Sequence, residues 1–182
     1  MPKNKLQFTS DLNIVKFDNR KRMWEKPLMK KRQQRRSDCP INFSLETFGD
    51  NWSLLIIRDI VYFGKKTYGE FLDSDEGIAT NILADRLVHL EERGILVKKR
   101  HATDKRKEVY DLTEKGLDLI PILLDMGAWG AKHDPQTGAP PAWIAMVNAD
   151  RANIIRQVRE TVQNGGSIFV GDDSLFSKLL AA

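Results

Sequence analysis

Residues 77–113 read GIATNILADRLVHLEERGILVKKRHATDKRKEVYDLT, an amphipathic segment followed by a strongly basic one. In its first half, leucines recur at intervals of four and three residues, which is the spacing of one apolar face of a helix. These leucines are Leu83, Leu87 and Leu90. The other positions from Thr80 to Arg93 are mostly small or polar, and Gly94 is suited to end the helix. We therefore predict an amphipathic helix over residues 80–93.

The second half of this stretch predicts a basic hairpin. Residues 95–102 and 108–112 are compatible with β-strands, and the sequence TDKR between them is typical of a polar turn. Residues 98–107 contain six Lys or Arg residues and His101, against a single acid, Asp104. A hairpin with this charge can place cations on DNA phosphates. The alternative is an exposed edge whose lysines only discourage aggregation.

Three further helices are predicted upstream, because apolar residues recur there with helical spacing. They span residues 40–49, 51–62 and 68–72, and Asp50 is a good N-cap for the second of them. Helices followed by a tight break, a polar-faced helix and a basic hairpin form the order of a winged helix-turn-helix. The fold class we predict is mainly α (α+β), a winged helix-turn-helix domain with a two-stranded wing and added terminal helices.

The C-terminal third predicts more helix. Thr113 is suited to cap a fifth helix that reaches about His133. The prolines and glycine of residues 134–141 predict a linker, and residues 150–164 predict an amphipathic helix. Residues 167–170 predict a short strand. We expect three parts: a basic, flexible extension over 1–38, the winged helix over 39–134, and a linker with a helical extension over 135–182.

Composition bounds the classes of protein that the chain can belong to. The formal charge is +4, and nine Lys or Arg residues between positions 20 and 36 face one acid there. Such a block is typical of a solvated arm, which can also contact nucleic acid. A single cysteine excludes an intramolecular disulfide framework. With no run of about 18 apolar residues and no apolar leader, we expect a cytoplasmic protein without a membrane segment.

Several motifs, in order, resemble the HxlR family of regulators. Cys39-Pro40 followed by FGDNWSLLI resembles the opening of that family, and YGEFL at 68–72 is similar to its aromatic-x-Glu-Leu step. GIA at 77–79, the run from Leu83 to Leu96, VYDLTEKG at 109–116 and Trp129-Gly130 continue the likeness. The sequence departs from the family at Ala79, where a serine is usual, and at Thr67, where an arginine is common.

The resemblance implies a homodimeric, MarR-like winged-helix repressor or activator that binds a two-fold-related operator on double-stranded DNA. It also implies that terminal helices form the dimer interface. Our candidates are the first helix and the fifth, the latter through Leu117, Ile120, Leu124 and Trp129. The alternative for these apolar residues is packing inside the domain.

Candidate DNA-binding residues follow from the positions of the predicted helix and hairpin. Base contacts are expected from Thr80, Asn81 and Asp85, with Ala84 placed for a thymine methyl group. Arg86 is better suited to phosphate. Lys65 and Lys66, just before Thr67, are further phosphate candidates. On the wing, the expected phosphate contacts are Arg100, Lys105, Arg106 and Lys107.

Cys39 is a redox-sensing candidate, because some members of the family sense oxidants with a cysteine at this position. A helix N-terminus and basic neighbours such as Arg35 and Arg36 favour a reactive thiolate. The alternative is an inert structural cysteine. Trp129 and Trp143 are expected to pack together near the linker; the alternative is that they line a pocket for a small effector.

Other functions have weaker support in the sequence. His89, His101 and His133 are far apart in the sequence and have no acidic or cysteine neighbours at the spacing of metal ligands. We therefore expect no metal site, no cofactor and no enzymatic activity. An active site in the C-terminal extension would need a catalytic spacing that we do not find. A winged helix used only for protein contacts remains the main alternative. It would not bind random duplex DNA with a steep dependence on salt.

Overall fold

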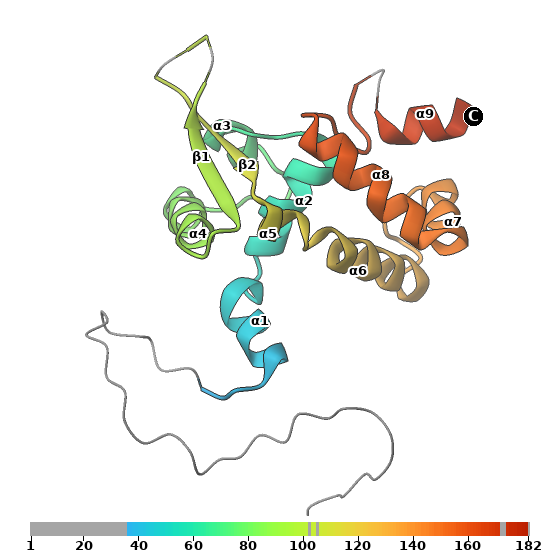
Figure 1. The fold of residues 1–182 in the computed structure, drawn as a ribbon, viewed down its shortest axis with the longest axis horizontal. Coiled ribbons are helices and arrows are strands. Elements are labelled where there is room, and N and C mark those ends of the chain that lie inside the picture. Colours follow the sequence, from blue (N-terminus) through green and yellow to red (C-terminus); the bar gives the residue numbers. More distant parts are fainter. Residues whose placement is uncertain (1–35, 102, 105, 172–173, 182) are drawn as a thin grey trace, which may run out of the picture. The chain divides into compact units, whose positions relative to one another are not determined.

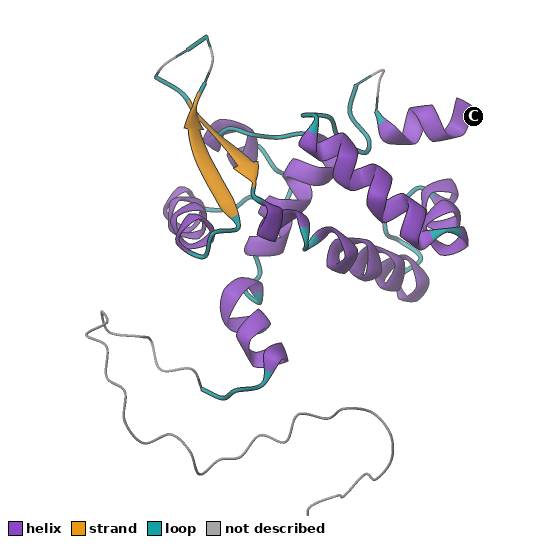
Figure 2. Ribbon diagram, in the orientation of Figure 1, coloured by secondary structure: helices purple, strands orange, loops and turns teal. Residues whose placement is uncertain are grey.

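The computed structural model describes residues 36–101, 103–104, 106–171 and 174–181. In chain order its elements are α1 (Pro40–Phe48), α2 (Ser53–Phe63), α3 (Tyr68–Leu72), α4 (Thr80–Glu92), β1 (Leu96–Arg100), β2 (Glu108–Leu112), α5 (Glu114–Leu117), α6 (Ile120–His133), α7 (Pro141–Ala149), α8 (Arg151–Gln163) and α9 (Leu175–Ala181). Figures 1 and 2 show mostly helices and a β-hairpin, which is the two-stranded sheet of β1 and β2. The predicted fold class is confirmed.

Helix α2 lies at the centre because it is apolar on most of its surface. Its residues Ile56, Ile57, Ile60 and Val61 are all buried. The helix begins at Ser53, two residues later than predicted. The Asp50 carboxylate still accepts hydrogen bonds from the backbone N–H groups of Trp52 and Ser53, at 2.9 and 3.0 Å. Gly64 ends the helix in the left-handed region (φ +68°), which favours glycine.

Helices α3 and α4 form the helix-turn-helix. Thr67 and Glu70 cap α3 reciprocally: the Thr67 hydroxyl accepts from the Glu70 N–H, and the Glu70 carboxylate accepts from the Thr67 N–H. The leucine stripe of α4 faces the core as predicted, with each of its three leucines at most 2% exposed. Ala79 stands at the N-cap of α4 and provides no side-chain hydrogen bond, yet the helix begins at Thr80.

The wing is the hairpin of β1, β2 and the loop between them. The strands pair antiparallel, with Leu96 opposite Leu112 and Arg100 opposite Glu108. On its other side β2 is held by the segment before α3, because the Tyr110 N–H donates to the Lys66 carbonyl at 2.8 Å. The predicted strands are confirmed, with β1 shorter at both ends than residues 95–102.

The single fifth helix that we predicted is wrong, because the chain forms two helices there. Thr113 caps the first, α5, accepting a hydrogen bond from the Gly116 N–H at 3.1 Å. The chain then breaks, and α6 begins at Ile120 with Pro121 in its first turn. Proline has no N–H to continue the preceding helix, but it is favoured where a new one starts.

The segment after residue 134 contains more regular structure than the linker and single helix that we predicted. Helix α8 confirms the predicted helix, whereas α7 was missed because prolines precede it. Residues 167–170 are not a strand. Instead, the N–H groups of Ile168 and Phe169 donate to the carbonyls of Val61 and Tyr62 at 3.1 and 2.9 Å. These carbonyls lie in the last turn of α2, where the helix itself provides no donors.

The C-terminal helices share one hydrophobic core with the winged helix. Buried residues of this segment include Trp143, Val147, Ile154, Val158 and Ile168. They belong to the same cluster as the buried face of α2. Aromatic rings reinforce the junction, since Phe169 lies edge-on to Tyr62, Trp143 and Phe176 at 5.5–5.6 Å. Among the described residues, every helix is too short or too polar to cross a membrane.

Candidate DNA-binding surface

The outer face of α4 carries the residues expected to contact bases. Thr80, Asn81, Ala84 and Asp85 are all exposed on this helix, opposite its buried leucines. Val88 is also exposed, by 54%, one turn beyond Ala84 on the same ridge. We did not single out Val88 from the sequence, although its spacing of four from Ala84 was a usable signal. The face therefore combines polar side chains with a short apolar strip.

The N-terminal end of α4 is fixed by a side chain from α3. The Tyr68 hydroxyl donates a hydrogen bond to the Thr80 carbonyl oxygen at 2.8 Å. Because Thr80 is the first residue of α4, this bond sets the position of the end that would enter a DNA groove first. The sequence analysis used Tyr68 only as part of a family motif and gave it no such role.

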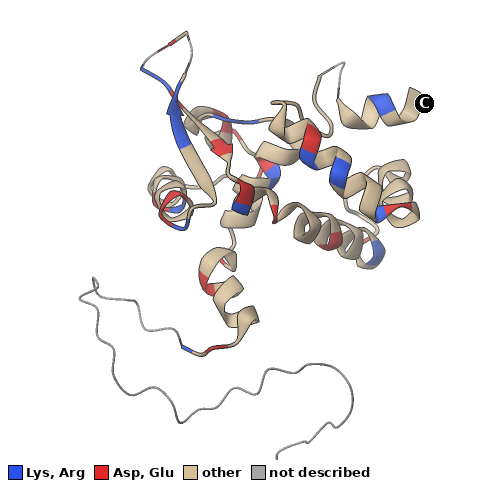
Figure 3. Ribbon diagram, viewed as in Figure 1, with Lys and Arg blue, Asp and Glu red and all other residues tan. Residues whose placement is uncertain are grey.

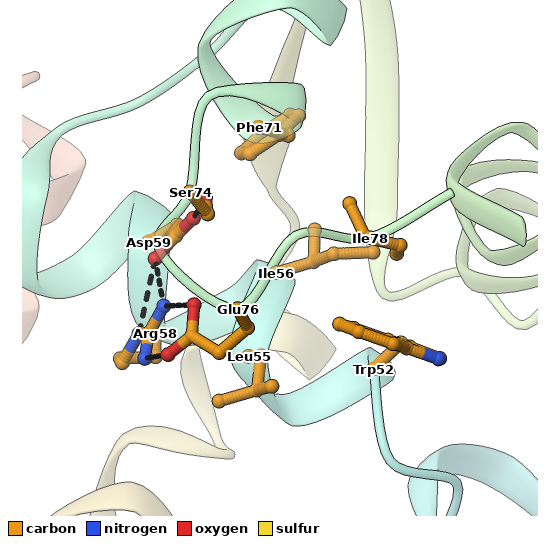
Figure 4. Close-up of a pocket in the computed structure, with 9 residues that line it drawn as sticks. All are labelled: Trp52, Leu55, Ile56, Arg58, Asp59, Phe71, Ser74, Glu76 and Ile78. Atoms are coloured by element: carbon orange, nitrogen blue, oxygen red, sulfur yellow. Dashed lines mark hydrogen bonds and ion pairs between the residues drawn. The ribbon is translucent and has the colours of Figure 1, made fainter. Parts of the chain in front are cut away.

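The turn between α3 and α4 is clamped onto α2 by a group of charges. The Arg58 guanidinium hydrogen-bonds both carboxylate oxygens of Glu76, and its Nη2 lies 2.6 Å from the Asp59 carboxylate. Asp59 also accepts a hydrogen bond from the Ser74 hydroxyl. The hydrogen bond from Arg58 holds the pKa of Glu76 below its ordinary value. Figure 4 shows Arg58 between the two carboxylates.

The two lysines before Thr67 lie within the domain's own ion pairs. The Lys65 ammonium is 3.2 Å from the Asp59 carboxylate and 2.7 Å from the Ser74 hydroxyl. The Lys66 ammonium is 2.9 Å from Asp111 on β2. Burial raises the pKa of Asp111, but hydrogen bonds from Lys66 and Lys99 outweigh it, so the pKa is lowered. A phosphate contact by either lysine stays a prediction, and it would compete with these carboxylates.

Arg86 connects α4 to the start of α2. Its guanidinium lies 2.8 Å from the Asp85 carboxylate and 3.4 Å from that of Asp50. The Arg86 side chain is 25% exposed, compared with 70% for Asp85. Arg86 therefore holds a candidate base-contacting carboxylate in place, and its expected contact with phosphate stays a prediction.

The wing places its cations in solvent. Arg100 and Lys107 are exposed, and the Arg106 side chain is 92% exposed despite an ion pair with Asp104 at 3.3 Å. Lys105 lies outside the described residues. Figure 3 shows Lys and Arg along β1. A groove of about 570 Å³ lies between these cations and the start of α3, with Arg100, Arg106 and Lys107 among its lining residues.

Cys39 is exposed at the N-cap of α1. Its carbonyl accepts the first hydrogen bond of the helix, from the Phe43 N–H at 3.0 Å. Of its expected basic neighbours, Arg35 lies outside the described residues and Arg36 is paired with Glu46 at 3.1 Å. Exposure and position thus fit a reactive thiol, but Arg36 is committed to another partner.

The apolar candidates divide into buried and exposed residues. Leu117, Ile120 and Leu124 are each at most 2% exposed, so they pack inside the domain. Trp129 is 67% exposed and lies beside His133, with ring centres 4.8 Å apart. The expected pairing of Trp129 with Trp143 is wrong, since Trp143 is buried against Phe169 and Phe176. Within the described residues, no group of three or more His, Cys, Asp or Glu side chains could hold a metal ion.

Comparison with known proteins agrees with this architecture. A model of the HxlR-like helix-turn-helix family matches residues 47–137, which is half of the chain. The chain belongs to the HxlR-like helix-turn-helix family. The HxlR match begins at the end of α1 and includes the helix-turn-helix, the wing and α6. It ends before α7, so the last three helices lie outside it.

Similar proteins are HTH-type transcriptional regulators. An uncharacterized one from Mycobacterium tuberculosis is 34% identical over 98 residues, covering 54% of this chain and 61% of that protein. YybR of Bacillus subtilis is 33% identical over 52% of this chain and 75% of YybR. The crystal structure of PA1607, a candidate transcription factor, has 36% identity and a TM-score of 0.53 over 58% of this chain and 74% of PA1607. The chain thus spans 61% of the length of its mycobacterial relative.

Proposed function

We propose that the chain is a sequence-specific, DNA-binding transcription regulator. The observation that carries this proposal is the exposed face of α4, which is held at its first residue by Tyr68 and flanked by the cationic wing. Asn81 can form two hydrogen bonds to adenine, and the Asp85 carboxylate can accept one from cytosine. The names of the relatives support regulation of transcription as the purpose of this binding.

The wing would supply affinity without sequence information. Each phosphate that Arg100, Arg106 or Lys107 neutralises releases counterions, which steepens the dependence of log K on log salt by about 0.9. Phosphate contacts also fix the orientation of the protein, so that the face of α4 meets the base edges. The predicted role of Lys105 is the same.

We further propose a homodimer, which would match a two-fold-related operator. Large apolar side chains are exposed on α1 and α6, where a dimer interface could bury them: Ile41 by 69%, Leu45 by 56%, Met126 by 53% and Trp129 by 67%. Two recognition helices about 34–36 Å apart would then enter successive major grooves. In this arrangement residues 39–134 bind DNA, and residues 135–182 complete the core.

Gating by Cys39 is the finer part of the proposal. Two Cys39 thiols from different chains could form a disulfide, giving two electrons and two protons to an oxidant such as a peroxide. Helix α1, which follows Cys39 directly, contacts α4, because His89 Nε2 hydrogen-bonds the Thr47 carbonyl at 3.0 Å. Movement of α1 would therefore reach the DNA-binding face. A small-molecule effector is the alternative signal.

Fluorescence anisotropy with a labelled fragment of the gene's own upstream region tests the proposal. We expect tighter binding than to a scrambled duplex, and a slope of log K against log salt that falls by about two in Arg100→Ala/Arg106→Ala. Arg156→Ala on α8, also an exposed arginine, is the matched control and should keep the slope. If folded, reduced protein binds neither duplex, the protein-contact alternative replaces this function.

A further inference from the structure

A second cleft lies between the base of the wing and the C-terminal end of α8. It has a volume of about 210 Å³ and is lined by residues of α2, β1, β2, α5 and α8, but by none of α4 among the described residues. The family match ends at residue 137, so the α8 wall comes from the part of the chain outside it. This cleft therefore depends on the C-terminal extension.

One group of lining side chains carries a net positive charge. The ammonium groups of Lys66 and Lys99 lie 2.9 and 3.2 Å from the two oxygens of the Asp111 carboxylate. Two cations thus share one anion. Each ammonium has three N–H donors, and the bond to Asp111 uses one of them. A ligand carboxylate placed here could accept hydrogen bonds from the N–H groups of both lysines that the bond to Asp111 does not use.

Glu114 and its partners form a second charged group beside the cleft, and their net charge is negative. Glu114 accepts hydrogen bonds from Arg159 at 2.6 Å and from Gln163 at 3.0 Å. Arg159 is shared with Asp118 at 2.9 Å, so that two carboxylates face one guanidinium. A carboxylate has about four acceptor positions, so Glu114 can accept a further donor. A ligand ammonium group would fit beside Glu114.

The lining also contains the apolar side chains of Ile60, Leu112, Leu117 and Val162. Ile60 and Leu117 are buried, so the half-buried Leu112 and Val162 are the apolar side chains that a ligand can contact. We propose that the cleft binds a free α-amino acid with an apolar side chain. Its carboxylate would lie at Lys66 and Lys99, its ammonium at Glu114, and its side chain against Leu112 and Val162.

Binding of the amino acid would change the ion pairs of the wing and so its contact with DNA. This regulatory step rests on the proposed function. Lys99 and Asp111 lie on β1 and β2, and Lys99 directly precedes the DNA-contact candidate Arg100. A ligand carboxylate competes with Asp111 for the two lysines. It therefore changes the ion pair that joins β2 to the segment before α3 and the ion pair that joins β1 to β2.

Isothermal titration calorimetry on the full chain tests the site without DNA. The probes are L-leucine, L-isoleucine, L-valine and L-methionine. Two analogues of leucine are added: 4-methylpentanoate, which lacks the ammonium, and 3-methylbutylamine, which lacks the carboxylate. We expect at least one amino acid to bind. Both analogues should bind at least about tenfold more weakly than that amino acid. If none of the four amino acids binds, or if an analogue binds as well as leucine, the proposal is overturned.

Variants locate the binding. Lys99→Met and Glu114→Gln should each weaken it about tenfold, whereas Lys98→Met should not, because Lys98 pairs with Glu108 outside the cleft. Equal binding by all three variants would overturn the assignment to this cleft. The bound amino acid is then added to the anisotropy assay. Amino-acid binding without any DNA binding would refute the proposed function but not the cleft, and DNA binding without amino-acid binding would refute the cleft alone.

Discussion

Asp59→Asn is the substitution that most directly tests the clamp between α2 and the helix-turn-helix turn. The Asp59 side chain is 3% exposed and accepts two hydrogen bonds from Arg58 on one oxygen, with Lys65 and Ser74 on the other. Asparagine has one oxygen and no charge, so it loses the contacts of the second oxygen. Hydrogen bonds to charged groups contribute about 1.5–3 kcal/mol each. We expect the free energy of unfolding to fall by about 3 kcal/mol, the low end of the range for a broken buried ion pair.

The loss stays at that low end because both cations can be partly rehydrated. The Arg58 and Lys65 side chains are 22% and 23% exposed. Urea unfolding at pH 7 and fixed protein concentration measures the effect, and the melting temperature should fall by about 6–12 °C. Glu76→Gln is the matched control, since its side chain is 33% exposed and should cost about 1 kcal/mol or less. An Asp59→Asn loss no larger than that of Glu76→Gln would refute the role of Asp59 as the buried centre of the clamp.

Three further predictions concern α2, the C-terminal segment and the dimer. Burial raises the pKa of Tyr62 to about 12, so folding favours its neutral form and the free energy of unfolding falls as pH rises from about 10 to 12. The urea midpoint of Tyr62→Phe should fall less over that pH range than the midpoint of the unchanged protein. An equal fall would contradict the assignment. Phe169→Ala should cost about 3 kcal/mol in urea unfolding, whereas Val170→Ala, 55% exposed, should cost under about 0.5 kcal/mol. In analytical ultracentrifugation, Leu45→Asp should shift the protein from dimer toward monomer, whereas Val170→Asp should not. A dimer that Leu45→Asp leaves unchanged would exclude α1 from the interface.

Local periodicity made the winged helix predictable from the sequence. A helix that buries one stripe must repeat its apolar residues every three or four positions, and Leu83, Leu87 and Leu90 do so. The hairpin was predictable for a similar reason, since a polar turn joins two short strand-compatible runs. The exposed positions of α4 followed from the same helical geometry. Thr80, Asn81, Ala84 and Asp85 were therefore placed correctly on its outer face.

Features set by contacts between distant segments were not predictable in this way. The ion pair of Lys65 with Asp59 and that of Lys66 with Asp111 join residues 6 and 45 positions apart. From the sequence, both lysines resemble free surface cations. Residues 167–170 have strand-like composition, but their N–H groups meet the carbonyls at the end of α2 instead. No local pattern reveals which acceptor a segment will find.

Helix α2 links the candidate DNA-binding face to the C-terminal segment. Through Arg58 and Asp59 it holds the turn before α4, and through the carbonyls of Val61 and Tyr62 it holds residues 168 and 169. Damage to the C-terminal core should therefore lower stability and, through it, the amount of protein able to bind DNA. It should leave the salt slope of the remaining binding unchanged, because that slope counts phosphate contacts. Loss of wing cations should do the reverse. Measuring stability and salt slope on the same variants thus separates residues that build the domain from residues that touch DNA.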